Sequence, residues 1–133
     1  TYRIDKYESK EISKSEGGVA IGLPLVILTD GGTASASEVV TGALKDYNAA
    51  VTVGTTTFGK GVVQLPFELK SGIGGLKVTV SKYYTPKGED INKKGIIPDY
   101  EVKLTEEDVN KDYSKDTDPQ LQKGIEVIKD MIK

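Results

Sequence analysis

Two side chains of the types needed for nucleophilic chemistry, Ser35 and Lys60, lie 25 residues apart in this chain. A serine hydroxyl becomes a nucleophile when a neighbouring base removes its proton. The sequence holds no histidine and no cysteine, which excludes Ser-His-Asp hydrolysis, thiol chemistry, disulfide bonds and thiolate zinc sites. If the chain is an enzyme of the nucleophilic type, a lysine must therefore serve as the base.

Ser35 lies where a buried strand is expected to lead into a helix. The apolar run 23–28 stands between Gly22 and an Asp-Gly-Gly turn, which is typical of a strand buried on both faces. Apolar residues at helical spacing then continue up to Asn48. A helix start offers free N–H groups and favours negative charge, as a serine nucleophile and its oxyanion require. The same residues also fit a capping box, in which Ser35 only caps the helix and Glu38 bonds back, so both interpretations stay open.

Lys60 stands between two glycines in the sequence Phe-Gly-Lys-Gly at 58–61. A lysine in such a loop is either an ordinary exposed turn residue or a general base. A base must give up its proton near neutral pH, which burial in a dry pocket favours. We expect the flanking glycines to let other backbone come close, and Phe58 and Val62 to exclude water.

Three longer motifs follow one another in the chain, and the first two contain Ser35 and Lys60. They are Gly-Thr-Ala-Ser-Ala-Ser-Glu at 32–38, Thr-Phe-Gly-Lys-Gly-Val-Val-Gln at 57–64 and Gly-Ile-Ile-Pro-Asp at 95–99. Over roughly residues 23–102 the chain thereby resembles the carboxyl-terminal processing, or tail-specific, serine peptidases.

The resemblance implies roles for individual residues. Ser35 would be the nucleophile and Lys60 the base of a Ser-Lys dyad, while Gln64 helps to hold the lysine amine. The backbone N–H of Ala36 would be one oxyanion donor. The competing hydroxyl of Ser37 lies one step inside the helix, where a helix-facing polar residue is expected.

An acidic residue at the far end of the helix, Asp46, is expected to be structural. Eleven residues of helix cover about 16 Å, too far for contact with Ser35.

The resemblance implies that the protein is a serine endopeptidase. It would cleave proteins near their C-terminus through an acyl-enzyme, with no cofactor and no metal. The alternative is a non-catalytic module that binds peptide tails or assembles with other proteins, in which Lys60 recognises a carboxylate.

The expected fold is α/β, with a partial crotonase/ClpP-like strand-helix core, an antiparallel hairpin and a C-terminal helix. We expect a twisted sheet with the Ser35 helix on one face, Lys60 at the mouth of the hairpin and Asp118 as N-cap of the last helix. The expected elements are parallel strands at 23–28 and 49–54, hairpin strands at 62–69 and 76–84, a short strand at 100–104, a charged linker at 108–116 and a terminal helix whose apolar stripe is Leu121, Ile125, Ile128 and Ile132.

The length of 133 residues favours a single domain. It divides into a peripheral strand or hairpin at 1–22, a core at 23–104, and a linker and terminal helix at 105–133. By resemblance this is the C-terminal part of a peptidase catalytic domain, without the PDZ module and the upstream catalytic segment. Because the family's second oxyanion donor comes from that upstream segment, we expect the chain alone to be weakly active or inactive.

Charge and family resemblance together predict the partners. With 18 basic and 20 acidic residues the chain has no polybasic character, which argues against nucleic acid. Expected partners are proteins or peptides with accessible C-termini, and an unpaired sheet edge makes a homo-oligomer possible. The family's usual setting is extracytoplasmic: cell envelope, periplasm, thylakoid lumen or secreted.

Overall fold

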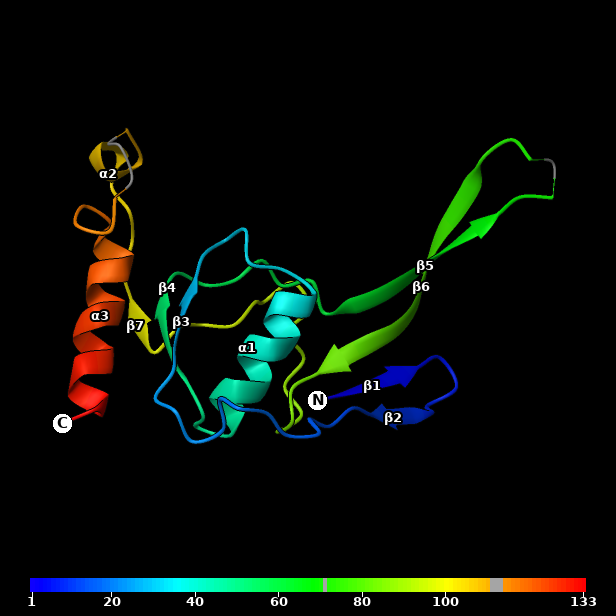
Figure 1. Ribbon diagram of the computed structural model, residues 1–133. Coiled ribbons are helices and arrows are strands. Elements are labelled where there is room, and N and C mark those ends of the chain that lie inside the picture. Colours follow the sequence, from blue (N-terminus) through cyan, green and yellow to red (C-terminus); the bar gives the residue numbers. More distant parts are fainter. Residues whose placement is uncertain (71, 111–113) are drawn as a thin grey trace.

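The computed structural model describes residues 1–70, 72–110 and 114–133 as a mixed α/β protein (Figure 1). Its strands form two sheets, one of four strands in the order β2-β1-β6-β5 and one of three strands in the order β3-β4-β7. The elements are β1 (Tyr2–Asp5), β2 (Lys10–Ile12), β3 (Val26–Thr29), α1 (Ala36–Asp46), β4 (Val51–Gly54), β5 (Val62–Glu68), β6 (Gly75–Tyr84), β7 (Tyr100–Glu101), α2 (Glu106–Asn110) and α3 (Pro119–Met131).

The three-stranded sheet carries the expected strand-helix-strand unit. β3 and β4 are parallel, with Val26 opposite Val51, and α1 connects them. β7 adds a further parallel strand beside β4. Figure 1 shows α1 and α3 on opposite sides of this sheet. Gly124 lets α3 approach closely, because a Cβ there would lie 3.0 Å from the side chain of Leu28. The predicted parallel unit and the packing of the terminal helix are thus confirmed.

The prediction that the first strand is buried on both faces is wrong. β3 begins at Val26, and Leu23 and Leu28 are 62% and 40% exposed. The physical reason is its place at the edge of the sheet, since only β4 pairs with it among the described strands. β4 is the buried strand, with Val53 and Thr52 fully enclosed.

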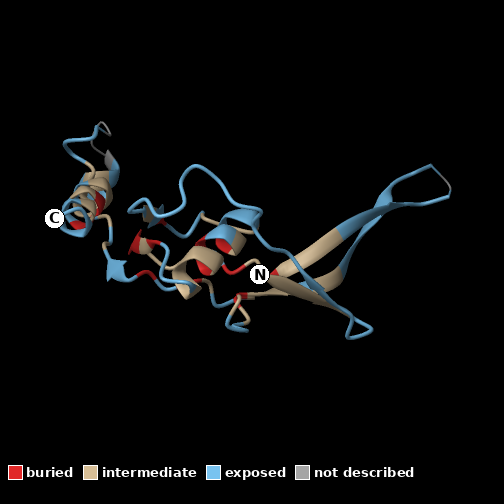
Figure 2. Cartoon of the chain, turned by 60° about the horizontal axis from the view of Figure 1, so that its bottom comes forward, coloured by how far each residue is buried: buried red, intermediate tan, exposed pale blue. Residues whose placement is uncertain are grey.

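The four-stranded sheet is separate from the first. β5 and β6 form the predicted antiparallel hairpin, with Leu65 opposite Val78. They pair with the β1–β2 hairpin rather than with β3 and β4. The outer half of this hairpin, residues 65–70 and 72–79, is called the arm below. It projects from the body, and Figure 2 shows it exposed on both strands.

The C-terminal segment matches the prediction only in part. Asp118 caps α3, because its carboxylate accepts hydrogen bonds from the next turn's N–H groups. The most buried positions of α3 are Gly124 and Val127, whereas Ile132 of the predicted stripe is 65% exposed. The predicted linker begins inside α2, and its residues 111–113 lie outside the described residues. None of the helices within the described ranges is long and apolar enough to cross a membrane.

Candidate active site

Ser35 occupies a sharp backbone turn at the start of α1. It is the N-cap residue, with φ 58° and ψ −116°, a conformation that residues with a Cβ rarely adopt. Such a conformation costs about 1–3 kcal/mol and is found mainly at functional sites. The turn before it is held by Asp30, whose carboxylate accepts the N–H groups of Gly32 and Thr33 at 2.9 Å each. The sequence Asp-Gly-Gly-Thr therefore builds a rigid entry to the serine.

A free backbone donor follows the serine directly. Within the part of the chain that the structure describes, the N–H of Ala36 has no acceptor, whereas the N–H of Ser37 donates to the carbonyl of Ala34 at 3.2 Å. The first N–H groups of a helix lack intrahelical partners and favour negative charge nearby. The N–H of Ala36 is thus available to an oxyanion formed at Ser35.

The loop that carries Lys60 packs tightly against the segment 92–95. A Cβ on Gly59 would lie 2.8 Å from the backbone nitrogen of Gly95, and one on Gly61 would lie 2.7 Å from that of Asn92. The carbonyl of Gly59 also accepts a hydrogen bond from the N–H of Lys93 at 2.7 Å. The prediction that the flanking glycines allow close backbone approach is confirmed.

The side chain of Lys60 is only partly buried. Phe58 is 64% exposed, so the prediction that it excludes water from the lysine is wrong, while Val62 is half-buried. Across residues 1–70, 72–110 and 114–133, the Nζ atom of Lys60 has no hydrogen-bond acceptor and no acidic partner. The amine is therefore free to meet a hydroxyl or a substrate, in a site open to solvent.

Glu38 joins the serine turn to the lysine loop. Its side chain is fully buried, and its two oxygens accept four hydrogen bonds. They come from the N–H of Ser35 at 2.9 Å and of Lys60 at 2.8 Å, both to Oε2, and from the N–H of Gly59 at 2.7 Å and the hydroxyl of Thr57 at 2.5 Å, both to Oε1. Because two bonds share Oε2, the backbone nitrogens of Ser35 and Lys60 lie no farther apart than their sum, about 5.7 Å.

These hydrogen bonds keep Glu38 ionised. Burial alone would raise the pKa of this carboxyl, but the bonds from Thr57, Lys60, Gly59 and Ser35 outweigh it and hold the pKa below its ordinary value. The sequence pattern identified Glu38 only as a capping partner of Ser35. That bond is present, so the cap and the site coexist. The three longer-range donors were missed, and no signal in the sequence points to them.

Two further predicted residues lie elsewhere. Gln64 is on β5, and its Nε2 donates to the hydroxyl of Thr79 on β6 at 3.2 Å; no bond to Lys60 is recorded among the described residues. Its role at the lysine amine stays a prediction. Asp46 accepts the N–H of Lys87 at 2.8 Å at the far end of α1, as expected of a structural residue.

The class of protein follows from comparison with known families. Residues 1–102 match the model of Peptidase family S41, and the chain belongs to this family. The resemblance to carboxyl-terminal processing peptidases is thereby confirmed.

Individual relatives agree with this membership. The carboxyl-terminal-processing protease of Synechocystis sp. is 48% identical over 98 residues, covering 74% of this chain and 23% of the relative. The carboxyl-terminal-processing protease of Picosynechococcus sp. is 42% identical over 127 residues, covering 96% of this chain and 30% of the relative. A probable CtpA-like serine protease of Staphylococcus aureus is 54% identical over 80 residues, covering 60% and 16%. The chain spans less than a third of each of these relatives.

Of two similar solved structures, one is a processing protease and the other shows only a related fold. A photosystem II D1 C-terminal processing protease superposes with a TM-score of 0.58 at 50% identity, covering 62% of this chain and 21% of that protein. A lipoprotein from Streptococcus agalactiae superposes with a TM-score of 0.70 at 22% identity, covering 98% and 44%, and shows likeness of fold alone.

Proposed function

We propose that this chain carries the Ser-Lys dyad of a serine endopeptidase that cleaves proteins near their C-terminus. The observation that supports it best is the Glu38 carboxylate, which binds the backbone of both Ser35 and Lys60 through one oxygen. Membership of a peptidase family favours this function over a tail-binding module. The β3–α1–β4 unit would be part of a crotonase/ClpP-like core.

The proposed reaction is acyl transfer to Ser35. The neutral amine of Lys60 takes the hydroxyl proton while Oγ attacks the peptide carbonyl, and the N–H of Ala36 donates to the resulting oxyanion. Collapse of the tetrahedral intermediate breaks the C–N bond, and the lysine ammonium gives its proton to the leaving amine. Water then attacks the acyl-enzyme. The neutral lysine amine takes a proton from this water and gives it to Oγ of Ser35 as the ester bond breaks. In this scheme Gln64 orients the amine.

We expect the 133-residue chain alone to be weakly active or inactive. A lysine base works best in a dry site, and here Phe58 is 64% exposed and Lys60 only partly buried. One backbone donor, that of Ala36, serves the oxyanion, and losing one of two such donors typically costs about 100-fold or more in rate. Full activity would then need further protein around the dyad.

The substrates and the location of the reaction are proposed from the names of the relatives. Expected substrates are proteins and peptides with accessible C-termini, because the relatives are named for carboxyl-terminal processing. An extracytoplasmic location is proposed on the same basis, and two relatives are named as chloroplastic.

A serine-reactive fluorophosphonate probe tests the dyad without requiring turnover. Labelling is expected in the unmodified chain, absent in Ser35→Ala and strongly reduced in Lys60→Met. The matched control Ser37→Ala alters a second hydroxyl two residues away and should label normally. Labelling that survives Ser35→Ala, or that is unchanged in Lys60→Met, contradicts the dyad. A fluorogenic peptide assay then tests the expected weak activity, and rapid turnover that depends on Ser35 would show that the chain alone suffices.

A further inference from the structure

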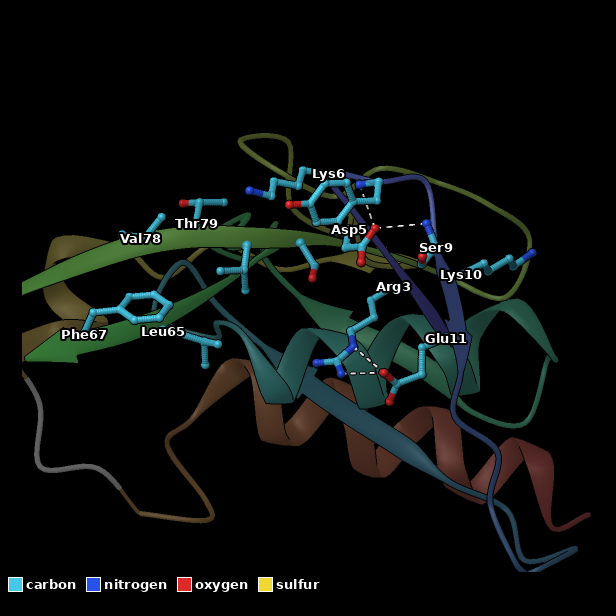
Figure 3. Close-up of a pocket in the computed structure, with 13 residues that line it drawn as sticks. Arg3, Asp5, Lys6, Ser9, Lys10, Glu11, Leu65, Phe67, Val78 and Thr79 are labelled. Carbon is cyan, nitrogen blue, oxygen red and sulfur yellow. Dashed lines mark hydrogen bonds and ion pairs between the residues drawn. The ribbon is translucent and has the colours of Figure 1, made fainter.

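A pocket of about 500 Å³ lies against the four-stranded sheet (Figure 3). Leu65, Phe67 and Val78 of the arm line one side, and the β1–β2 hairpin lines the other. Neither Ser35 nor Lys60 lines it. The three apolar side chains are 47%, 49% and 43% exposed, which is much apolar surface to leave in water.

The pocket meets an unpaired edge of β6. This strand has 10 residues, but β1 pairs only with residues 81–84, so 75–80 have no partner on that side among the described strands. Four consecutive residues of β6, 78–81, line the pocket. The pairing with β5 skips Val80 between Thr79 and Ser81, so side chains do not alternate strictly there, and the pocket lies where β6 leaves its pairing with β1.

The two edges of the arm differ in their capacity to accept another strand. The outer edge belongs to β5 and contains Pro66, which has no N–H to donate. Proline on an edge strand protects it from further pairing. The β6 edge over residues 75–80 contains no proline. The open edge is therefore the one beside the pocket.

The charged side of the pocket carries positive charge without an acidic partner. Arg3 donates to the carboxylate of Glu11, with its Nε 3.0 Å from Oε2, as Figure 3 shows. Asp5 accepts two backbone N–H groups of the turn that follows it. Lys6 and Lys10 instead lie over tyrosine rings, at 4.8 and 3.9 Å, and no carboxylate is recorded with either of them in the described ranges. The complementary ligand is thus anionic at this end.

We propose that this pocket binds the free C-terminal segment of another protein, added as a strand along residues 75–80 of β6. Backbone hydrogen bonds to a sheet edge supply affinity, and pockets for alternate side chains supply specificity. Here an apolar side chain packs against Phe67, and the terminal carboxylate lies at Lys6. Because Lys6 follows Asp5, which pairs with Ser81, the bound tail ends near residue 81 and runs parallel to β6. The site goes beyond the proposed dyad, since it holds tails without cutting them.

The test uses the full 133-residue chain with the substitution Ser35→Ala, so that no ligand is cut. A six-residue peptide with alternating apolar side chains is titrated, once as the free acid and once as the C-terminal amide. Backbone NMR shifts should cluster at 76–81, and the amide should bind about 5-fold more weakly, the effect of one exposed ion pair. Lys6→Glu should weaken the acid similarly, whereas Lys70→Glu at the arm tip is the matched control and should not.

Five outcomes overturn the proposal. If the free acid and the amide bind equally, the site does not recognise the terminal carboxylate. If the two lysine substitutions have equal effects, Lys6 is not the residue that binds it. Shifts confined to the loops around residues 35 and 60 place the tail in the cleavage site. Self-association through the arm that the peptide does not displace, measured by sedimentation, makes a second copy the occupant of the edge. Phe67→Ser, which changes an exposed side chain, is expected to fold and to weaken both peptides, and unchanged affinity there also refutes the pocket.

Discussion

Replacing Glu38 by glutamine tests the contact on which the active-site geometry depends. The change keeps the size of the side chain and removes its charge. The carboxylate accepts four hydrogen bonds and donates none. An amide offers one acceptor oxygen, and its NH₂ group must face either the two donors at Oε1 or the two at Oε2.

With the NH₂ group at Oε2 the N–H groups of Ser35 and Lys60 lose their acceptor, and with it at Oε1 the N–H of Gly59 does, since the Thr57 hydroxyl can turn and accept instead. Each donor left unsatisfied costs about 1–3 kcal/mol, so Glu38→Gln should lower the free energy of unfolding by about 1–6 kcal/mol. This is a large part of the roughly 5–15 kcal/mol that stabilises a typical domain. The effect should depend on pH, because the pKa of Glu38 is lower in the folded chain than its ordinary 4.5. The stabilisation is complete above that value and is lost as the pH falls through the lowered pKa.

Urea unfolding at a series of pH values measures both effects. The matched control is Glu16→Gln, an exposed residue whose substitution should change stability by less than about 0.5 kcal/mol. The difference between the two variants should be largest at pH 7 and should shrink below pH 4.5. If both variants unfold at the same urea concentration at pH 7, Glu38 is not the group that holds the two loops together.

Three other substitutions follow from the same geometry. Ser35→Gly should be more stable than Ser35→Ala by about 1 kcal/mol in thermal unfolding, because glycine relieves the strain at φ 58°; a more stable alanine variant would argue against strain there. Gly95→Ala should cost about 2 kcal/mol or more beyond Gly72→Ala in urea unfolding, since the two have similar φ of 72° and 69°, but only the former places a Cβ 2.2 Å from the carbonyl oxygen of Thr57; equal losses would show that the loop yields freely. Asp99→Asn should destabilise the chain at pH 7 and progressively less below pH 3.8, because burial raises the pKa of Asp99 but its hydrogen-bonded partners lower it further; a loss that persists at low pH would assign the effect to shape rather than charge.

Local patterns in the sequence predicted the elements well. The Asp-Gly-Gly turn, the helical spacing after Ser35 and the alternation in 76–84 each define their element through neighbours in the chain. The N-cap Asp118 predicted the start of α3 for the same reason. These features depend on residues a few positions apart, which a single sequence displays directly.

Features that depend on distant packing could not be predicted. Apolar composition alone does not tell a central strand from an edge strand, so the exposure of Leu28 was missed. The division into two sheets is decided by the pairing of β1 with β6, whose residues are far apart in the chain. The exposure of Phe58 likewise depends on what packs over the lysine loop. The burial of Glu38 contradicts its polar type and arises only when 57–60 folds back on α1.

The short chain separation of the Glu38 contacts has a consequence for the order of folding. Its longest bond spans 22 residues, from Glu38 to Lys60, and closing a loop of this length costs less entropy than closing a much longer one. The pairing of Tyr2 with Tyr84 in the other sheet requires most of the chain to be gathered first. Contacts of low sequence separation form faster than such long-range pairings. The nucleophile turn and the lysine loop are thus expected to meet early, while the N-terminal strand is still unfolded.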